Sequence, residues 1–234
     1  MTRWHDTWCY KPDIEVRKGL PHCRNCNKSP DINTLVNNAT VNNATVPNPF
    51  SQAPEDEPLG ELNLYWPSSV IYSGPTGTDR SKPVKKGRRE PKPSQAYPNR
   101  LGTAEFRLLR LHPSNDVEDP VWGELESYPL QRCPEYEATS YTWASEDGDA
   151  SLCRPIFLGP YWDIQLQTTN YWSMLQAMRF PGKGSRMIWI DAICINQDDI
   201  EERDSQVSQM SQIYTGCRRV FLYLGPDITS PLGN

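Results

Sequence analysis

Carboxylates gathered between residues 191 and 204 are the first side chains in this sequence that could do chemistry. The apolar run 188–194 contains one of them, Asp191, and is followed by Asn196, Gln197 and further acidic residues. A lone carboxylate inside a covered strand needs hydrogen-bond partners or a raised pKa, because burying an unpaired charge is costly. In open α/β sheets, ligand sites lie beyond the carboxyl ends of the strands. The pattern therefore favours an active or binding site around residues 194–202.

The same acidic residues also fit a structural interpretation, as the start of a helix. Asp198 with Glu201, or Asp199 with Glu202, has the spacing of a capping box. Acidic groups in the first turn are stabilised by the helix dipole. We therefore predict that Asp198 or Asp199 mainly caps a helix, and a ligand site above the strand stays a separate hypothesis.

Cys194 is a candidate nucleophile by residue type alone. Thiolate catalysis needs a basic partner, usually a histidine. The histidines are at positions 5, 22 and 112, so none of them follows the strand that contains Cys194. We therefore expect Cys194 to be a small residue of the core.

A separate set of metal-ligating residues occurs near the N-terminus. His5, Cys9, Cys23 and Cys26 supply a Cys3His set, and His22 is an alternative histidine. These side chains are the usual ligands of tetrahedral structural zinc sites. The single C-x2-C pair is only half of a zinc motif, so free thiols are the competing interpretation. A metal would help a patch of this size, which is too small to fold by burial alone.

Residues 101–234 have the sequence pattern of short strands and helices, which could position a site around residues 194–202. Strands are predicted at 105–113, 138–145, 188–194 and 219–227, with a hairpin over 155–166 around Gly159-Pro160. A helix is expected from Thr168 or Thr169 to Phe180, and a second one over 199–215. The core-facing side of the second helix is predicted from steps of three and four as Ile200, Arg203, Val207, Met210 and Tyr214. Strand–helix–strand order predicts an α/β fold with a parallel sheet and flanking helices.

The N-terminal half differs in composition from the folded half. Residues 1–26 form a small patch rich in Cys, His and Trp, and residues 27–100 read as a disordered, Pro-rich, partly basic linker. The linker contains the tandem VNNAT repeat at 36–45 and a basic run at 82–93. We interpret the basic run as solvated linker, with nuclear import or an acidic partner as the alternative.

Composition also narrows the classes of function. No run reaches the roughly 18 apolar residues of a membrane span, and the N-terminus lacks the apolar segment of a secretory signal. The seven cysteines are odd in number and scattered, which favours thiols or metal ligands in a reducing compartment. Residues 101–234 hold 19 Asp and Glu against 10 Lys and Arg, which argues against nucleic acid as a partner. We therefore expect a cytoplasmic protein.

Two blocks of the folded half resemble a known family. The blocks are YEATSYTWA at 136–144 and IWIDAICINQDDIEERDSQVSQMSQIYTGCRRVFLYLGPD at 188–227. Both are similar to hallmarks of the fungal heterokaryon incompatibility (HET) domain, and the resemblance extends over about residues 105–234. Thr139 and Ala144 replace the Leu and Gly that are usual in the family.

The resemblance implies a fold as well as a function. The fold would be a flavodoxin/TIR-like parallel sheet, and it would be incomplete at the C-terminus, because the family domain usually continues past this point. The function would be an intracellular non-self-recognition module that triggers programmed cell death in fungi. Such a module would assemble with like domains or act under a recognition protein.

An enzymatic alternative follows from the likeness between HET and TIR domains. Some TIR domains cleave NAD with a catalytic Glu, so the alternative is an NAD glycohydrolase or nucleotide-binding effector that uses Glu202 or Asp199. Fold-level analogy does not establish function, and the sequence contains no nucleotide fingerprint.

At the end of the 188–194 strand we expect a binding or structural site. Its members would be Tyr141, Trp143, Asp191, Asn196 and Gln197. Asp191 should be buried in a central parallel strand and, together with Trp143, should hold the strand-end loops in place.

Overall fold

A computed structural model describes residues 1–43, 97–143, 149–182 and 184–224. Most of the predicted linker, including the basic run at 82–93, lies outside the described residues, and so does the C-terminal end from residue 225. The described N-terminal segment contains β1 (Ile14–Arg17), β2 (Leu20–Cys23) and α1 (Ile32–Asn43). The rest contains β3 (Glu105–Leu111), β4 (Trp122–Pro129), β5 (Glu137–Tyr141), β6 (Arg154–Leu158), β7 (Asp163–Gln167), α2 (Thr169–Met178), β8 (Arg186–Trp189), α3 (Asp191–Cys194), α4 (Ile200–Gly216) and β9 (Arg219–Tyr223).

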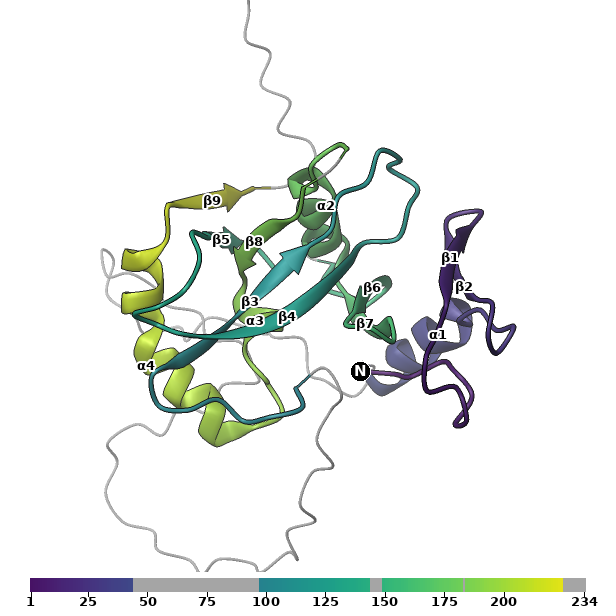
Figure 1. The fold of residues 1–234 in the computed structure, drawn as a ribbon, viewed down its shortest axis with the longest axis horizontal. Helices are drawn as coiled ribbons and strands as arrows, with labels where there is room; N and C mark the ends of the chain where they lie inside the picture. Colours follow the sequence, from purple (N-terminus) through teal and green to yellow (C-terminus); the bar gives the residue numbers. More distant parts are fainter. Residues whose placement is uncertain (44–96, 144–148, 183, 225–234) are drawn as a thin grey trace, which may run out of the picture.

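Strands β3 to β9 form one mixed sheet in the order β7-β6-β4-β3-β8-β5-β9 (Figure 1). Strand β3 is antiparallel to both of its neighbours, β4 and β8, and β6 is antiparallel to β7. The pairs β4–β6, β5–β8 and β5–β9 are parallel. The α/β class is confirmed, but the prediction of a parallel sheet is wrong, and no flavodoxin or TIR assignment is confirmed.

The antiparallel centre of the sheet comes from β4, which was not among the predicted strands. The chain turns back after Leu111, and β4 pairs with β3 along its whole length, from Glu105↔Pro129 to Leu111↔Gly123. Gly123 is needed at the close end of this ladder, because an added Cβ would lie 2.6 Å from the Leu109 side chain. A hairpin therefore replaces the crossover that a parallel sheet would require.

The other predicted elements of residues 101–224 lie close to their expected positions. Strand β3, the hairpin β6–β7 and helix α2 are confirmed, and the Thr168 side chain accepts a hydrogen bond from the Tyr171 N–H at the start of α2. Four successive residues of β3, from Phe106 to Leu109, are buried, so both faces of this strand are covered. Covered strands of this kind place the core at the middle of the sheet.

Helix α4 begins and ends as predicted, but its orientation is rotated from the prediction. Ile200 and Val207 are exposed, whereas the buried positions are Glu202, Gln206, Gln209 and Ile213. The polar side faces the sheet because it finds partners there; the Gln206 amide, for example, donates to the Glu105 carbonyl at 2.7 Å. Met210 and Tyr214 are half-buried and do pack against the core. At 17 residues α4 is the longest helix of the described ranges, none of whose helices is long and apolar enough to cross a membrane.

Part of the N-terminal half has regular structure. Within the range that we predicted as disordered linker, Ile32–Asn43 forms helix α1. Its first turn is stabilised by Asp31, which accepts hydrogen bonds from the Thr34 N–H at 3.1 Å and the Thr34 hydroxyl at 2.7 Å. Figure 1 shows β1, β2 and α1 together beside the hairpin β6–β7.

Candidate functional site

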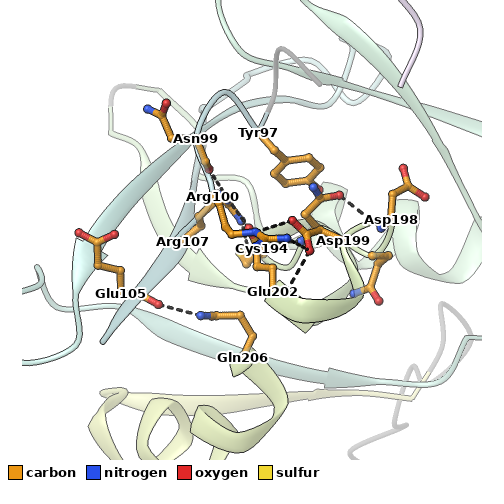
Figure 2. A network of polar contacts seen from close by, with 12 residues as sticks. Tyr97, Asn99, Arg100, Glu105, Arg107, Cys194, Asp198, Asp199, Glu202 and Gln206 are labelled. Carbon is orange, nitrogen blue, oxygen red and sulfur yellow. Dashed lines mark hydrogen bonds and ion pairs between the residues drawn. The ribbon is translucent and has the colours of Figure 1, made fainter. Parts of the chain in front are cut away.

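A buried ion pair lies between the sheet and the start of α4 (Figure 2). Arg107 on β3 and Glu202 in the first turn of α4 have side chains that are each only 2% exposed. The guanidinium binds both carboxylate oxygens: Nη1 contacts Oε1, and Nη2 lies 3.0 Å from Oε2. This two-point contact is the strongest ion-pair geometry available to an arginine.

Arg107 and Glu202 also bind the surrounding backbone. Arg107 Nη2 donates to the Asn99 carbonyl at 2.8 Å, and the Asn196 N–H donates to Glu202 Oε1 at 2.9 Å. The ring of Tyr97 lies 4.9 Å from the guanidinium carbon, and the Tyr97 hydroxyl donates to the Ile193 carbonyl at 2.7 Å. The pair therefore joins β3, α4, the 195–199 loop and the segment before β3. Both Glu202 oxygens bind groups of the protein, and the carboxylate is shielded from solvent.

Asp199 is the N-cap of α4, as one of the two predicted alternatives requires. Its side chain accepts a hydrogen bond from the Glu202 N–H at 3.2 Å. Arg100 holds the same carboxylate through Nε at 2.8 Å and Nη2 at 2.7 Å. The hydrogen bond from Arg100 is the main reason that the pKa of Asp199 lies below its usual value. Half of the capping box is present, because the Glu202 carboxylate binds the Asn196 N–H instead of reaching back to Asp199.

The position of Asp191 corrects the prediction of a carboxylate within a central parallel strand. Strand β8 ends at Trp189, and Asp191 is the first residue of the short helix α3. Its Oδ1 accepts hydrogen bonds from the Ala192 N–H at 2.7 Å and from the Tyr141 hydroxyl at 3.3 Å. Burial raises the pKa of Asp191, and these hydrogen bonds oppose the shift only in part. The side chain is partly buried and has partners, as an enclosed carboxylate requires.

The other residues of the predicted strand-end site lie around Asp191. The Gln197 amide donates to the Asp191 carbonyl at 2.9 Å, and the Asn196 side chain accepts from the Asp198 N–H at 3.3 Å. Trp143 is half exposed and stacks on Tyr141, with 6.2 Å between ring centroids. Among the described contacts it is Tyr141, and not Trp143, that binds Asp191.

Next to the residues around Asp191, the aromatic side chains are buried and closely packed. The Tyr171 ring meets the Tyr141 ring edge to face at 5.0 Å. The Tyr171 hydroxyl and the Trp189 Nε1 are buried and have no hydrogen-bond partner within the described part of the chain. Burial raises the pKa of the Cys194 thiol to about 12, which fits the prediction of a core cysteine and not of a nucleophile.

The predicted metal ligands converge in the N-terminal segment. The donor atoms of His5, Cys9, Cys23 and Cys26 all lie within 4.8 Å of one another. Burial lowers the pKa of His5, which favours its neutral ring. His22, the alternative ligand, instead contacts the Ser29 hydroxyl at 3.1 Å.

Sequence reasoning missed the partners of the acidic residues. Arg107 was read only as part of a strand, although a charged residue between Phe106 and Leu108 is itself a signal that an acidic partner is needed. Tyr97 and Arg100 were assigned to the linker, and their Pro-rich neighbourhood carries no signal that they would pack on α3 and α4.

Comparisons with known proteins give one family and one relative. Residues 136–232 match the family described as "Heterokaryon incompatibility protein (HET)". The chain is 31% identical over 140 residues to "Heterokaryon incompatibility protein 6, OR allele" of Neurospora crassa. That alignment covers 54% of this chain and 19% of the relative, so the chain spans about a fifth of the relative's length. No solved structure matches. The matched region includes Asp191, Asp199 and Glu202, but Arg107 and the four predicted metal ligands lie outside it.

Proposed function

We propose that the protein is a non-self-recognition signalling module that triggers cell death by assembling with like domains, because residues 136–232 match the heterokaryon incompatibility (HET) family. The relative is a heterokaryon incompatibility protein by name, which supports a role of this type.

The observation that carries the assembly proposal is strand β9. Among the described residues it is the last strand in the sheet order, beside β5. Phe221 and Tyr223 pack against the core, while the alternate residues Val220, Leu222 and Leu224 point outward, and Leu222 is 71% exposed. A terminal strand that exposes apolar side chains is a template for pairing with another chain.

A second copy of the same domain fits this strip. Apolar side chains at every second position are self-complementary when two copies of the strand meet about a two-fold axis. The arginines at the start of the strand are neutralised within their own chain: Arg219 binds Glu137 at 2.6 Å, and Arg218 binds Glu135 at 2.6 Å. Two copies can therefore approach without bringing uncompensated like charges together.

The alternative, NAD cleavage by Glu202 or Asp199, has less support from the geometry. A catalytic carboxylate must reach its substrate. Glu202 is enclosed and engaged by Arg107, and Asp199 is engaged by Arg100 and by the helix N-terminus. Incubating the purified chain with NAD tests this alternative directly, and turnover would replace the assembly proposal by an enzymatic one.

The assembly proposal predicts the effect of Leu222→Asp. The substitution places a charge on the exposed strip, so the association constant measured by light scattering at graded concentrations should fall at least tenfold, about 1.4 kcal/mol. Overexpression in fungal cells should then no longer kill. Since Leu222 is exposed, the thermal stability of the monomer should stay close to that of the parent.

A matched control keeps this test specific. Val117 is 72% exposed and lies in the connection between β3 and β4. Val117→Asp adds the same charge to an equally exposed apolar residue elsewhere, and it should leave association and killing unchanged. Undiminished association of the Leu222 variant, or equal losses in both variants, would count against β9 as the assembly surface.

A further inference from the structure

The N-terminal segment has too little apolar material for a core of its own. Its buried cluster consists of Cys9, Cys23 and Cys26, with Trp4 and Ile14 packed against it. Segments this short usually need a disulfide or a metal to hold one conformation. All three cysteines are free thiols, and the sulfurs of Cys9 and Cys23 lie 3.8 Å apart, whereas a disulfide has an S–S distance of about 2.05 Å.

Two of the distances between donor atoms match the edges of a tetrahedral zinc site, and all of them lie within 4.8 Å. Zinc binds sulfur at about 2.3 Å and histidine nitrogen at about 2.0–2.1 Å, so the edges of the tetrahedron are about 3.8 Å between two sulfurs and about 3.5 Å between nitrogen and sulfur. Cys9 Sγ and Cys23 Sγ are 3.8 Å apart, and His5 Nδ1 and Cys26 Sγ are 3.5 Å apart. Both distances agree with a shared central ion.

The hydrogen bonds of His5 leave the correct nitrogen available. His5 Nε2 lies 2.8 Å from the Tyr161 carbonyl oxygen, which can only accept. In a neutral ring Nε2 therefore carries the proton, and the lone pair is on Nδ1, which faces the cysteines. Metal-binding histidines are commonly oriented by such a bond from the second nitrogen to a carbonyl.

The backbone around the C-x2-C pair also suits a metal. The turn after Cys26 is closed by the Cys23 N–H, which donates to the Lys28 carbonyl at 2.8 Å, and Asn27 takes a positive φ of 55° within it. Structural zinc sites commonly take two of their ligands from a C-x2-C pair of this kind.

We propose that His5, Cys9, Cys23 and Cys26 bind one structural Zn²⁺ ion, and that this ion fastens the N-terminal segment to the hairpin β6–β7 of the HET-containing domain. On loading, the three thiols release their protons to solvent, His5 stays neutral, and the site carries a net charge of −1. No redox step is involved. The site does not depend on the assembly function proposed above.

The second part of the proposal rests on the residues next to His5. Thr2 and Ile164 exchange two backbone hydrogen bonds of 2.8 Å, so this segment forms a single antiparallel β-bridge to β7. The Trp4 indole donates to the Trp162 carbonyl at 2.7 Å. Arg3 binds the Asp163 carboxylate at 2.6 and 2.9 Å. His5 belongs to both sets, because one ring nitrogen faces the cysteines and the other binds Tyr161.

The first test measures metal in the full chain purified without chelator. We expect about one zinc per chain by elemental analysis, and less than about 0.2 for the Cys23→Ser/Cys26→Ser variant. Cys153→Ser is the matched control, because Cys153 is a partly buried thiol outside the cluster, and it should retain its zinc. Parent protein with less than 0.2 zinc per chain that also fails to take up added Zn²⁺, or a double variant that keeps its zinc, would overturn the proposal.

Two further measurements use the parent chain and so do not depend on a variant that folds. Replacing zinc with Co²⁺ should give the visible absorption of a tetrahedral thiolate site, and an octahedral spectrum contradicts the ligand set. Removing zinc with a chelator should raise the hydrogen-exchange rate of the Ile164 amide by roughly tenfold or more, since its acceptor is the Thr2 carbonyl. An unchanged rate at Ile164 would overturn the fastening role.

Discussion

Arg107 brings a permanent positive charge into the middle of the sheet, and Glu202 is the group that compensates it. The energetic weight of such a pair lies less in the attraction than in what remains when one partner is removed. This is why the Glu202 carboxylate matters for the fold, whatever its part in function.

Glu202→Gln should therefore destabilise the protein strongly. Glutamine can still accept the hydrogen bond from Asn196, but it leaves Arg107 buried without a counter-charge, and breaking a buried pair costs about 3–5 kcal/mol. Chemical denaturation at pH 7 measures the loss. Glu201→Gln is the matched control, since Glu201 is the neighbouring carboxylate, is 61% exposed and pairs with the exposed Arg100, and it should cost no more than about 1 kcal/mol. Equal stability of the two variants would show that the ion pair is dispensable.

Among the elements, β5, β8 and β9 are tied together by one carboxylate. Glu137 on β5 contacts Arg186 of β8 through both oxygens and binds Arg219 of β9 at 2.6 Å. Burial raises the pKa of Glu137, but the hydrogen bonds from Arg186 and Arg219 outweigh it, so the net shift is downward. The three strands that lead to the assembly edge therefore depend on an ionised Glu137.

The lowered pKa gives a pH dependence with a defined sign. A carboxyl group whose pKa is lower in the folded state contributes stability above its unfolded pKa, about 4.5, and loses it as the pH falls through the folded value. Glu137→Gln should lower the free energy of unfolding by about 3 kcal/mol at pH 7, and the difference from the parent should shrink below pH 4.5. Urea denaturation at pH 7 and at acidic pH measures both. Glu135→Gln, on an exposed residue nearby, is expected to be neutral, and a pH-independent effect at Glu137 would contradict the argument.

At the scale of helices and strands, the sequence predicts well those features that depend on residues close together in the chain. The caps Thr168 and Asp199 act within three residues, so the starts of α2 and α4 could be read directly. The four residues whose donor atoms converge, His5, Cys9, Cys23 and Cys26, could be grouped by residue type and short spacing. The buried side of α4 could not be predicted, because two of its polar residues face inward to partners that are distant in the sequence. Glu202 binds Arg107, 95 positions away, and Gln206 binds the Glu105 carbonyl. Strand β4 escaped prediction for a similar reason, since its place in the sheet depends on the whole ladder with β3.

For the whole molecule, the docking of the N-terminal segment can be separated from its metal. Arg3→Ala removes the cation that neutralises the nearly buried Asp163, while the four donor atoms stay in place. We expect the free energy of unfolding to fall by about 1–3 kcal/mol and the Ile164 amide to exchange faster, with zinc content unchanged. Arg17→Ala, on exposed β1, is the control. Loss of zinc in the Arg3 variant would mean that docking and metal binding cannot be separated in this way.

The β-bridge contributed by Thr2 has a consequence for the number of subunits that can join. It occupies the outer edge of β7 at Ile164, at the opposite end of the sheet from β9. Each copy then offers one sheet edge for pairing, which is a valence of one in polymer terms. Pairing through β9 about a two-fold axis therefore stops at two subunits. A chain that has lost its zinc would expose β7 and acquire a valence of two. Under the two proposals together, the metal thus sets whether association ends in a closed dimer or grows into an open fibre.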